Sequence, residues 1–284
     1  MLRRALQWLH GLRVASAATE ADLAANIPDA LWANAVAAYP FLSELEAPRQ
    51  QRLRVLSAAF LQRKEFHGAH GLEVTDAMAL CVAAQACLPL VDMGEGLAAL
   101  GWYGDFVGIV LHPGEMLAKR QSVDEAGVVH SWSEALTGEV MEQGPLTLSW
   151  QDVASAGAYA ASGYNVVIHE FVHVMDMHGK GGAAPDGCPL LPVGFMGHPT
   201  VRAARKAWQA TMQASFEKFA EAVARAERFG GIAQEPWLDA YAAQSVDEFF
   251  AVTAEAYFVA RQRFAQEFPE LLALYDAFFK RVPG

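Results

Sequence analysis

Apolar residues recur at helical spacing in the first third of the chain. In Ser43–Glu65, leucine, valine and phenylalanine fall three and four positions apart, which predicts a helix with one apolar face. Thr75–Leu90 is apolar nearly throughout, with Gln85 as an exception; it begins at a helix-capping threonine and is stopped at Pro89. This second pattern predicts a buried helix.

The period changes in the middle of the chain, where short β-branched and aromatic runs are separated by turn residues. The predicted strands are Phe106–Leu111, Gly127–Trp132, Glu139–Glu142 and Pro145–Trp150. Helical spacing returns in Tyr164–Met177, and the loop Gly179–Pro199 follows. Further helices are predicted from about Thr200 to Glu227 and from Ser245 to the end.

Helices, then a few strands, then helices do not alternate as in a parallel β-α-β fold. We therefore predict an α+β fold with a small mixed sheet packed against helices. Because no stretch resembles a flexible linker, residues 1–284 are expected to form a single compact domain. Residues 1–100 form its largely helical N-terminal part, and residues 101–284 carry the sheet and the mostly helical C-terminal part.

Composition narrows the class of protein. With 53% apolar and 19% charged residues, the 284-residue chain can bury a core, which excludes disorder throughout. The net charge of −11 opposes direct binding to nucleic acid or anionic lipid. Three cysteines are too few for a disulfide framework, and no apolar run reaches the length of a membrane span. We expect a cytoplasmic protein.

The segment Met1–Ala18 holds Arg3, Arg4 and Arg13, with no acidic residue before Glu20. Polar residues interrupt the apolar centre that a secretory signal requires. A transit peptide, a surface-seeking helix and an ordinary first helix remain as interpretations.

Two histidines stand four residues apart in the apolar run from Asn165 to Asp176, in the pattern His169-Glu170-x-x-His173. Residues four apart lie above one another on a helix, so both imidazoles can bind one metal ion. Neutral imidazoles suit Zn²⁺, and Glu170 can take a proton from water at the metal. The pattern predicts a zinc site, because burial of three ionisable groups would otherwise be costly.

A catalytic zinc needs a third protein ligand and an open position. The metzincin extension requires glycine at position 176 and histidine at position 179, but the chain has Asp176 and Gly179. The segment after Ser245 is the best other source. There Glu248 and Glu255 share one helical stripe with two valines, which indicates one ligand and one partner that orients a histidine.

The residues alone leave the choice of ligand open. Ser245-x-x-Glu248 is also a capping box, in which the carboxylate bonds only the first amide of the helix. Glu255 and Asp176 are rival ligands. Asp176 also lies on the face of the two histidines, where it could orient His173 without binding the metal or be an acid of the core far from the helix N-cap.

Four blocks of sequence resemble the Mlc titration factor A family of zinc metallopeptidases, which is similar in its catalytic core to the protease domain of anthrax lethal factor. The blocks are Cys87–Leu90, Gly144–Trp150, Ala161–Asn165 leading into the histidine motif, and Asp239–Ala243 continuing through Glu248 to Glu255. The resemblance implies a zincin-like metallopeptidase fold.

By this resemblance His169, His173 and Glu248 bind one zinc ion and Glu170 is the general base. The resemblance therefore favours Glu248 as a metal ligand over the capping-box role alone. Tyr241, seven residues before Glu248, matches a tyrosine that can donate to the oxyanion in such enzymes.

The function implied is zinc-dependent hydrolysis of peptide bonds in a peptide or protein substrate, with aminopeptidase activity as one form. The alternative is a regulatory protein that sequesters a transcriptional repressor of sugar uptake, and the acidic surface suits a basic DNA-binding partner. Two smaller expectations concern the surroundings. Leu146–Trp150 is either an edge strand that pairs with substrate or an interior strand, and Cys188 is exposed in its loop.

Overall fold

The computed structural model describes residues 19–114, 116–123, 129–136, 138–140, 144–230 and 235–280. The Arg-rich segment Met1–Ala18, with its possible roles, lies outside the described residues. For the strands between residues 116 and 140, only the backbone is described below.

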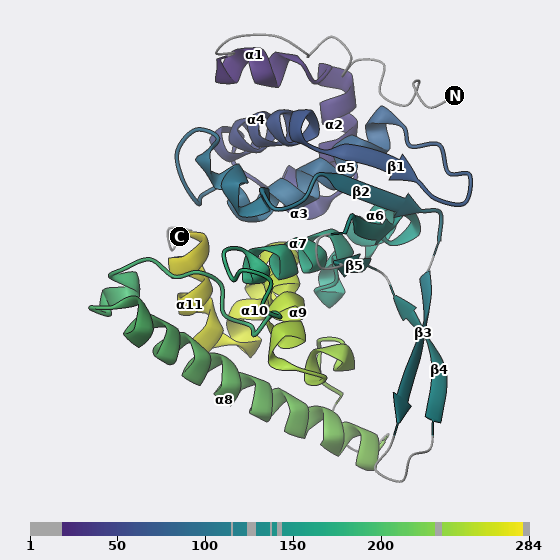
Figure 1. Cartoon of the computed structure of the whole chain (residues 1–284). Helices are drawn as coiled ribbons and strands as arrows, with labels where there is room; N and C mark the ends of the chain where they lie inside the picture. The colour runs from purple at the N-terminus through teal and green to yellow at the C-terminus, as the bar shows by residue number, and fades with distance from the viewer. Residues whose placement is uncertain are drawn as a thin grey trace.

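The N-terminal part is helical, as predicted, and packs above the sheet in Figure 1. Its helices are α1 (Glu20–Ala25), α2 (Asp29–Ala37), α3 (Pro40–Ser43), α4 (Ala47–Arg63) and α5 (Asp76–Cys87), followed by the short 3₁₀ helices η2 (Leu88–Leu90) and η3 (Ala98–Tyr103). The Thr75 hydroxyl caps α5 by accepting from the Met78 N–H. Most of α5 is buried, which confirms the prediction of a buried helix.

The main sheet has four strands in the order β1 (Glu65–Gly68), β2 (Gly108–His112), β6 (Leu146–Ser149) and β5 (Gly138–Val140). β1, β2 and β6 are parallel, and β5 is antiparallel to β6. The small mixed sheet against helices is therefore confirmed. β6 lies between two strands, so it is an interior strand and the edge-strand alternative for Leu146–Trp150 is wrong: the backbone of β5 already occupies its second side.

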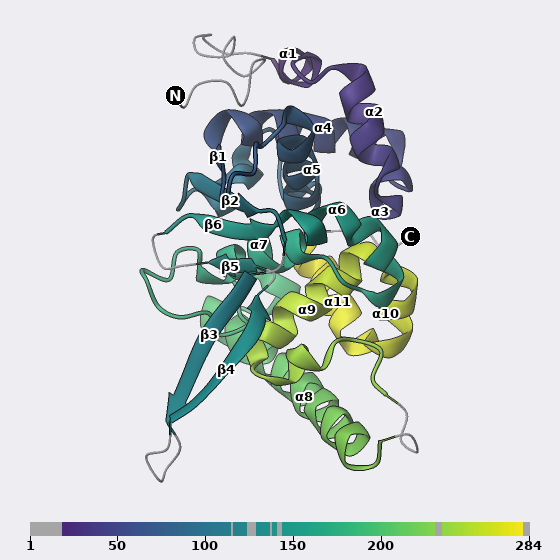
Figure 2. The same ribbon diagram turned by 90° about the vertical axis from the view of Figure 1, so that its right-hand side faces the viewer.

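The structure differs from the predicted pattern in three places. β1 begins two residues after the end of α4; the sequence pattern predicts no strand there, and the predicted helix Ser43–Glu65 reaches the first residue of β1. A two-stranded antiparallel ribbon of β3 (Met116–Val123) and β4 (Val129–Leu136) extends away from the main sheet (Figure 2). Only β4 overlaps a predicted strand. Trp150, predicted to end a strand, instead begins the helix α6 (Trp150–Tyr159).

The second helical layer lies on the other side of the sheet (Figure 1). Its elements are η4 (Ala160–Ser162), α7 (Val166–Met177), η5 (Phe195–Gly197), α8 (Val201–Arg228), η6 (Ala240–Ala243), α9 (Val246–Val259), α10 (Arg261–Glu267) and α11 (Pro269–Phe279). α8 is amphipathic and buries a stripe that includes Trp208, Met212 and Phe219. α7 and α9 are directly packed together, which brings the histidine motif beside the predicted ligand helix.

No helix in the described part of the chain combines the length and the apolar character that a membrane span needs.

Candidate metal centre

The histidine helix α7 starts at a tightly packed turn. The Asn165 side chain caps it by accepting from the Ile168 N–H at 2.9 Å. Two residues earlier, Gly163 has a φ of +85°, and a Cβ there would lie 3.0 Å from the side chains of Leu238 and Ala256. The turn therefore needs glycine both for its conformation and for its close approach to α9.

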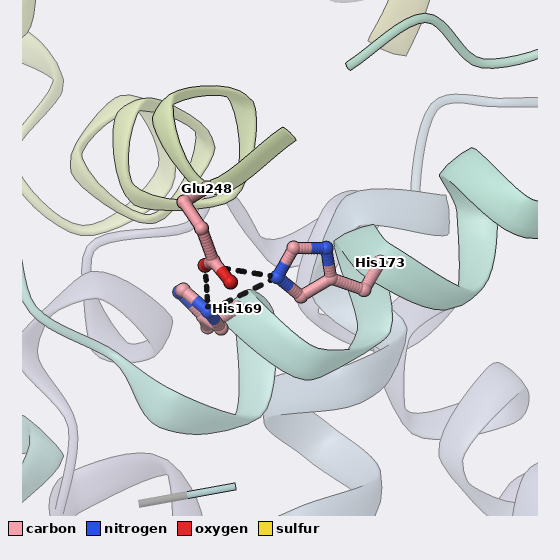
Figure 3. Close-up of side chains that lie close together, drawn as sticks. All are labelled: His169, His173 and Glu248. Atoms are coloured by element: carbon pink, nitrogen blue, oxygen red, sulfur yellow. Dashed lines mark hydrogen bonds and ion pairs between the residues drawn. The ribbon is translucent and has the colours of Figure 1, made fainter. Parts of the chain in front are cut away.

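α9 supplies the third member of the centre. The Ser245 hydroxyl caps this helix by accepting from the Glu248 N–H at 3.4 Å. The Glu248 carboxylate points away from the cap and towards His169 and His173, one turn apart on α7 (Figure 3). Its Oε2 lies 3.1 Å from His169 Nε2 and 3.2 Å from His173 Nε2. The serine thus caps the helix while the glutamate side chain faces the histidines.

The three donor atoms fit a tetrahedral metal ion. The two Nε2 atoms of His169 and His173 are themselves 3.2 Å apart, so the three distances are nearly equal. With metal–nitrogen bonds of about 2.05 Å, two ligands of a tetrahedral zinc lie about 3.3 Å apart. No other group of three His, Cys, Asp or Glu side chains in the described ranges is close enough to hold a metal ion.

Hydrogen bonding and burial set the charges of Glu248 and Glu170. Burial opposes ionisation of Glu248, but hydrogen bonds with His169 and His173 outweigh it and lower the pKa of Glu248 below its ordinary value. Burial raises the pKa of Glu170, although the two histidines oppose this shift. Glu248 is therefore held as a carboxylate, and Glu170 is a stronger base than an exposed glutamate.

Glu255 lies behind His169. Its Oε1 is 2.7 Å from His169 Nδ1, and its Oε2 accepts from the Asn165 N–H at 2.5 Å. A carboxylate on Nδ1 directs the other ring nitrogen, Nε2, towards the centre. The structure therefore places Glu255 as a partner of a histidine, and not among the three atoms that face one another.

Tyr241 belongs to η6, where its N–H donates to the Asp239 carboxylate at 2.9 Å. Its hydroxyl donates to Glu248 Oε1 at 2.9 Å. One oxygen of Glu248 thus faces the histidines, and the other accepts from a tyrosine. The expected oxyanion donor lies beside the centre and contacts one of its acids.

The expectation that Asp176 orients His173 is wrong. The carboxylate of Asp176 is fully buried and accepts from the N–H groups of Asp186, Gly187 and Cys188 at 2.7–3.1 Å. It also forms an ion pair with Lys180. Position 176 is in the last turn of α7, where the chain folds back, so its side chain binds the following loop.

That loop packs against the ligand helix. Gly187 has a φ of +70°, and a Cβ there would lie 2.8 Å from the carbonyl oxygen of Val246 in the first turn of α9. Cys188 is only 1% exposed, so its expected exposure is also wrong. The bonds of Asp176 therefore hold the loop at the end of α7, and the loop in turn packs against the start of α9, the helix that carries Glu248.

Sequence reasoning gave no role to two residues near the centre, Asn165 and Gln85. An asparagine directly before an apolar helical run is a capping signal. A single glutamine inside an apolar helix is also a signal, because its amide must find a partner when it is buried. The Asn165 Nδ2 donates to Gln85 Oε1 at 2.8 Å.

Known proteins similar to this chain share most of its length. The family model described as glucose-regulated metallo-peptidase M90 matches residues 15–280. Mlc titration factor A of Serratia proteamaculans is 33% identical over 254 residues, which cover 89% of this chain and 88% of the relative. The protein of the same name from Salmonella arizonae is 30% identical over 256 residues, which cover 90% of this chain and 92% of the relative.

Proposed function

Because the chain belongs to the family of glucose-regulated M90 metallopeptidases, we propose that it is a zinc peptidase whose metal is held by His169, His173 and Glu248. The observation that carries this proposal is the near-equal spacing of the three donor atoms, at 3.1–3.2 Å. Two imidazoles and one carboxylate are a catalytic donor set, which leaves a position for water. Structural zinc sites are more often closed and rich in cysteine.

The proposed reaction assigns separate tasks to the residues of the chain. When bound, a zinc ion lowers the pKa of water towards neutrality and polarises the peptide carbonyl. Glu170 accepts the proton of the attacking water and passes it to the leaving amine. The Tyr241 hydroxyl, which donates to Glu248 Oε1 at 2.9 Å in the resting site, turns its single hydrogen from that oxygen to the developing oxyanion.

We extend the proposal to aminopeptidase activity, which the sequence resemblance implies. The test is a pair of peptides that differ only in a free or an acetylated N-terminus. Faster cleavage of the free peptide is expected, with release of its first residue. Equal cleavage of both peptides, or cleavage within them, would contradict an aminopeptidase and leave a zinc peptidase in place.

The name of the relatives favours a second function. That name, Mlc titration factor A, indicates a protein that binds Mlc. The sequence resemblance implies a transcriptional repressor as the partner, and we propose this class of partner for the chain. The net charge of −11 suits a basic DNA-binding protein. Binding of purified Mlc by the chain, measured by calorimetry at two salt concentrations, tests this function; absence of binding at low salt would contradict it.

The central experiment compares the wild type with Glu170→Gln. We expect about one zinc per chain in both, because Glu170 is not among the proposed ligands, and peptide hydrolysis only in the wild type. Glu217→Gln changes an exposed glutamate of α8 and is the matched control. Equal hydrolysis by the wild type and Glu170→Gln would overturn the role of Glu170 as the base. Absence of zinc from the wild type would overturn the metal site.

A further inference from the structure

A glutamine is buried in a helix that supplies none of the proposed metal ligands. Gln85 of α5 is fully buried, and its neighbours in the helix are alanine, valine, cysteine and leucine. Burial of an amide is costly unless its donor and acceptor are both bonded. Its partners therefore indicate why this position is polar.

The two ends of the Gln85 amide have different partners. Nε2 donates to the carbonyl oxygen of Cys81, one turn earlier in α5, at 3.1 Å. This bond fixes the orientation of the amide, so that Oε1 points out of the helix. Oε1 accepts from Asn165 Nδ2 at 2.8 Å. Gln85 therefore holds the side chain of the residue that starts the histidine helix.

The Oδ1 atom and the backbone N–H of Asn165 bond to α7 and to Glu255, respectively. Its Oδ1 caps α7 through the Ile168 N–H at 2.9 Å, and its backbone N–H donates to Glu255 Oε2 at 2.5 Å. The other oxygen of Glu255 is 2.7 Å from His169 Nδ1. A series of hydrogen bonds thus connects Gln85, through the side chain and backbone of Asn165 and through Glu255, to an imidazole of the centre.

We propose that Gln85 is a positioning residue, which acts through Asn165 and Glu255 to fix the orientation of the His169 imidazole. Gln85, Asn165 and Glu255 are each no more than 1% exposed. Rotation of any one of these side chains would leave a buried polar group without its partner. Gln85 therefore fixes the Asn165 side chain at the start of α7, and the backbone N–H at this same position fixes Glu255. A cap alone requires only Oδ1 of Asn165, and it does not explain the bonds to Gln85 and Glu255. The inference rests on the proposed function, because it needs a metal at His169.

Two substitutions each remove one partner of the hydrogen bond between Asn165 Nδ2 and Gln85 Oε1. Gln85→Met keeps the length of the side chain and removes the acceptor. Asn165→Ser keeps a good helix cap and removes the Nδ2 donor. The matched control is Thr253→Val, which removes a buried hydroxyl of α9 that bonds Tyr275 at 2.6 Å and has no bond to the centre.

The measurement is the dissociation constant of Zn²⁺ by chelator competition, with the absorption spectrum of the Co²⁺-loaded protein and the unfolding midpoint as further readouts. Loss of a partner bonded directly to a metal-binding histidine weakens metal affinity 10–100-fold, so a change further out is expected to weaken it roughly 3–10-fold. Both variants should change the Co²⁺ spectrum. The double variant should lose no more affinity than the weaker-binding single variant, because both break one bond. Thr253→Val should lower the unfolding midpoint with unchanged Zn²⁺ affinity.

Three outcomes overturn the inference. They are unchanged Zn²⁺ affinity in the variants, an unchanged Co²⁺ spectrum, and additive losses in the double variant. If Gln85→Met does not fold, Asn165→Ser carries the same measurement with Gln85 in place, and wild-type affinity in that variant overturns the inference. A wild type that binds no Zn²⁺ overturns the proposed function instead.

Discussion

Glu255 lies 2.7 Å from Nδ1 of His169, on the opposite side of the ring from the nitrogen that faces Glu248. Two acids of one helix therefore contact the two nitrogens of a single imidazole. Their positions in α9, seven residues apart, place them on one face at different depths: Glu255 is almost fully buried, and Glu248 is partly exposed.

The first prediction separates these two acids by metal affinity. Glu248→Ala removes a proposed ligand and should abolish stoichiometric Zn²⁺ binding. Glu255→Ala removes a partner of a ligand and should weaken binding roughly 10–100-fold. The dissociation constants from chelator competition test this order. Equal losses in the two variants would leave the choice of Glu248 as the ligand without support.

The second prediction concerns Tyr241. Tyr241→Phe removes the hydroxyl that donates to Glu248 Oε1 and, in the proposed reaction, to the oxyanion. We expect kcat of the zinc-loaded protein to fall roughly 10²–10³-fold, as for loss of an oxyanion donor. Zn²⁺ affinity should fall less than tenfold, because the ligand itself remains. A large loss of affinity with unchanged kcat in the loaded protein would show that the tyrosine only holds Glu248.

The third prediction tests the loop contact of Asp176. Asp176→Ala leaves the buried Lys180 ammonium without one of its acids. It also removes the acceptor of the Asp186 and Gly187 N–H groups, whereas the Cys188 N–H keeps Asp186 Oδ1 as an acceptor. The free energy of unfolding should fall by about 3 kcal/mol, as for other broken buried pairs, with faster proteolysis in the loop 179–199.

Glu221→Ala is the matched control for Asp176. It breaks an exposed ion pair with Arg225 within α8, and the cost should be below about 0.5 kcal/mol. If Asp176→Ala is no more destabilising than this control, the loop contact does not stabilise the fold.

The fourth prediction is a pH dependence that arises from Lys64. Burial lowers the pKa of Lys64 from 10.5 to about 8, and its ammonium donates to the carbonyl oxygens of Tyr103 and Phe106. Between pH 8 and 10.5 the unfolded chain therefore binds more protons at this residue than the folded protein does. The stability contributed by Lys64 must rise with pH across this window.

Lys64→Met removes this dependence. The difference in unfolding free energy, wild type minus variant, should increase from pH 8 to pH 10.5 in urea titrations. Lys218→Met, at an exposed position of α8, is the matched control for the loss of a lysine side chain. A difference for Lys64→Met that stays constant with pH would contradict a lowered pKa of Lys64.

Strong local patterns predicted the long helices on both sides of the sheet, whereas several short elements were not predicted. α5, α7 and α8 have long apolar patterns with clear caps, so their positions follow from sequence. β1 has four residues and begins two residues after the end of a helix, and β3 contains a polar run, Lys119 to Ser122, that lacks strand alternation. Their pairing depends on neighbours distant in the sequence, and a local pattern does not contain that information.

The residues of the candidate site were likewise predicted only in part. His169, Glu170 and His173 belong to one helical motif, whereas Glu248 is 75 residues from His173, and the residues alone could not distinguish a ligand from a cap. Helical geometry places Asp176 on the face of the two histidines, but it does not show where the following loop returns to bind the Asp176 carboxylate. The role of Gln85 depends on a partner 80 residues away, so it required the packed structure.

The separation of the two ligand helices has a consequence for biosynthesis. A growing chain contains both histidines before it contains Glu248, with the whole of α8 made in between. Domains complete their folding as synthesis proceeds, and contacts between distant segments form late. A metal ion that meets the nascent chain early would find two imidazoles and no carboxylate from α9. For the proposed site, metal loading is thus expected to be coupled to the docking of α9, and an incomplete chain to hold the ion weakly and release it.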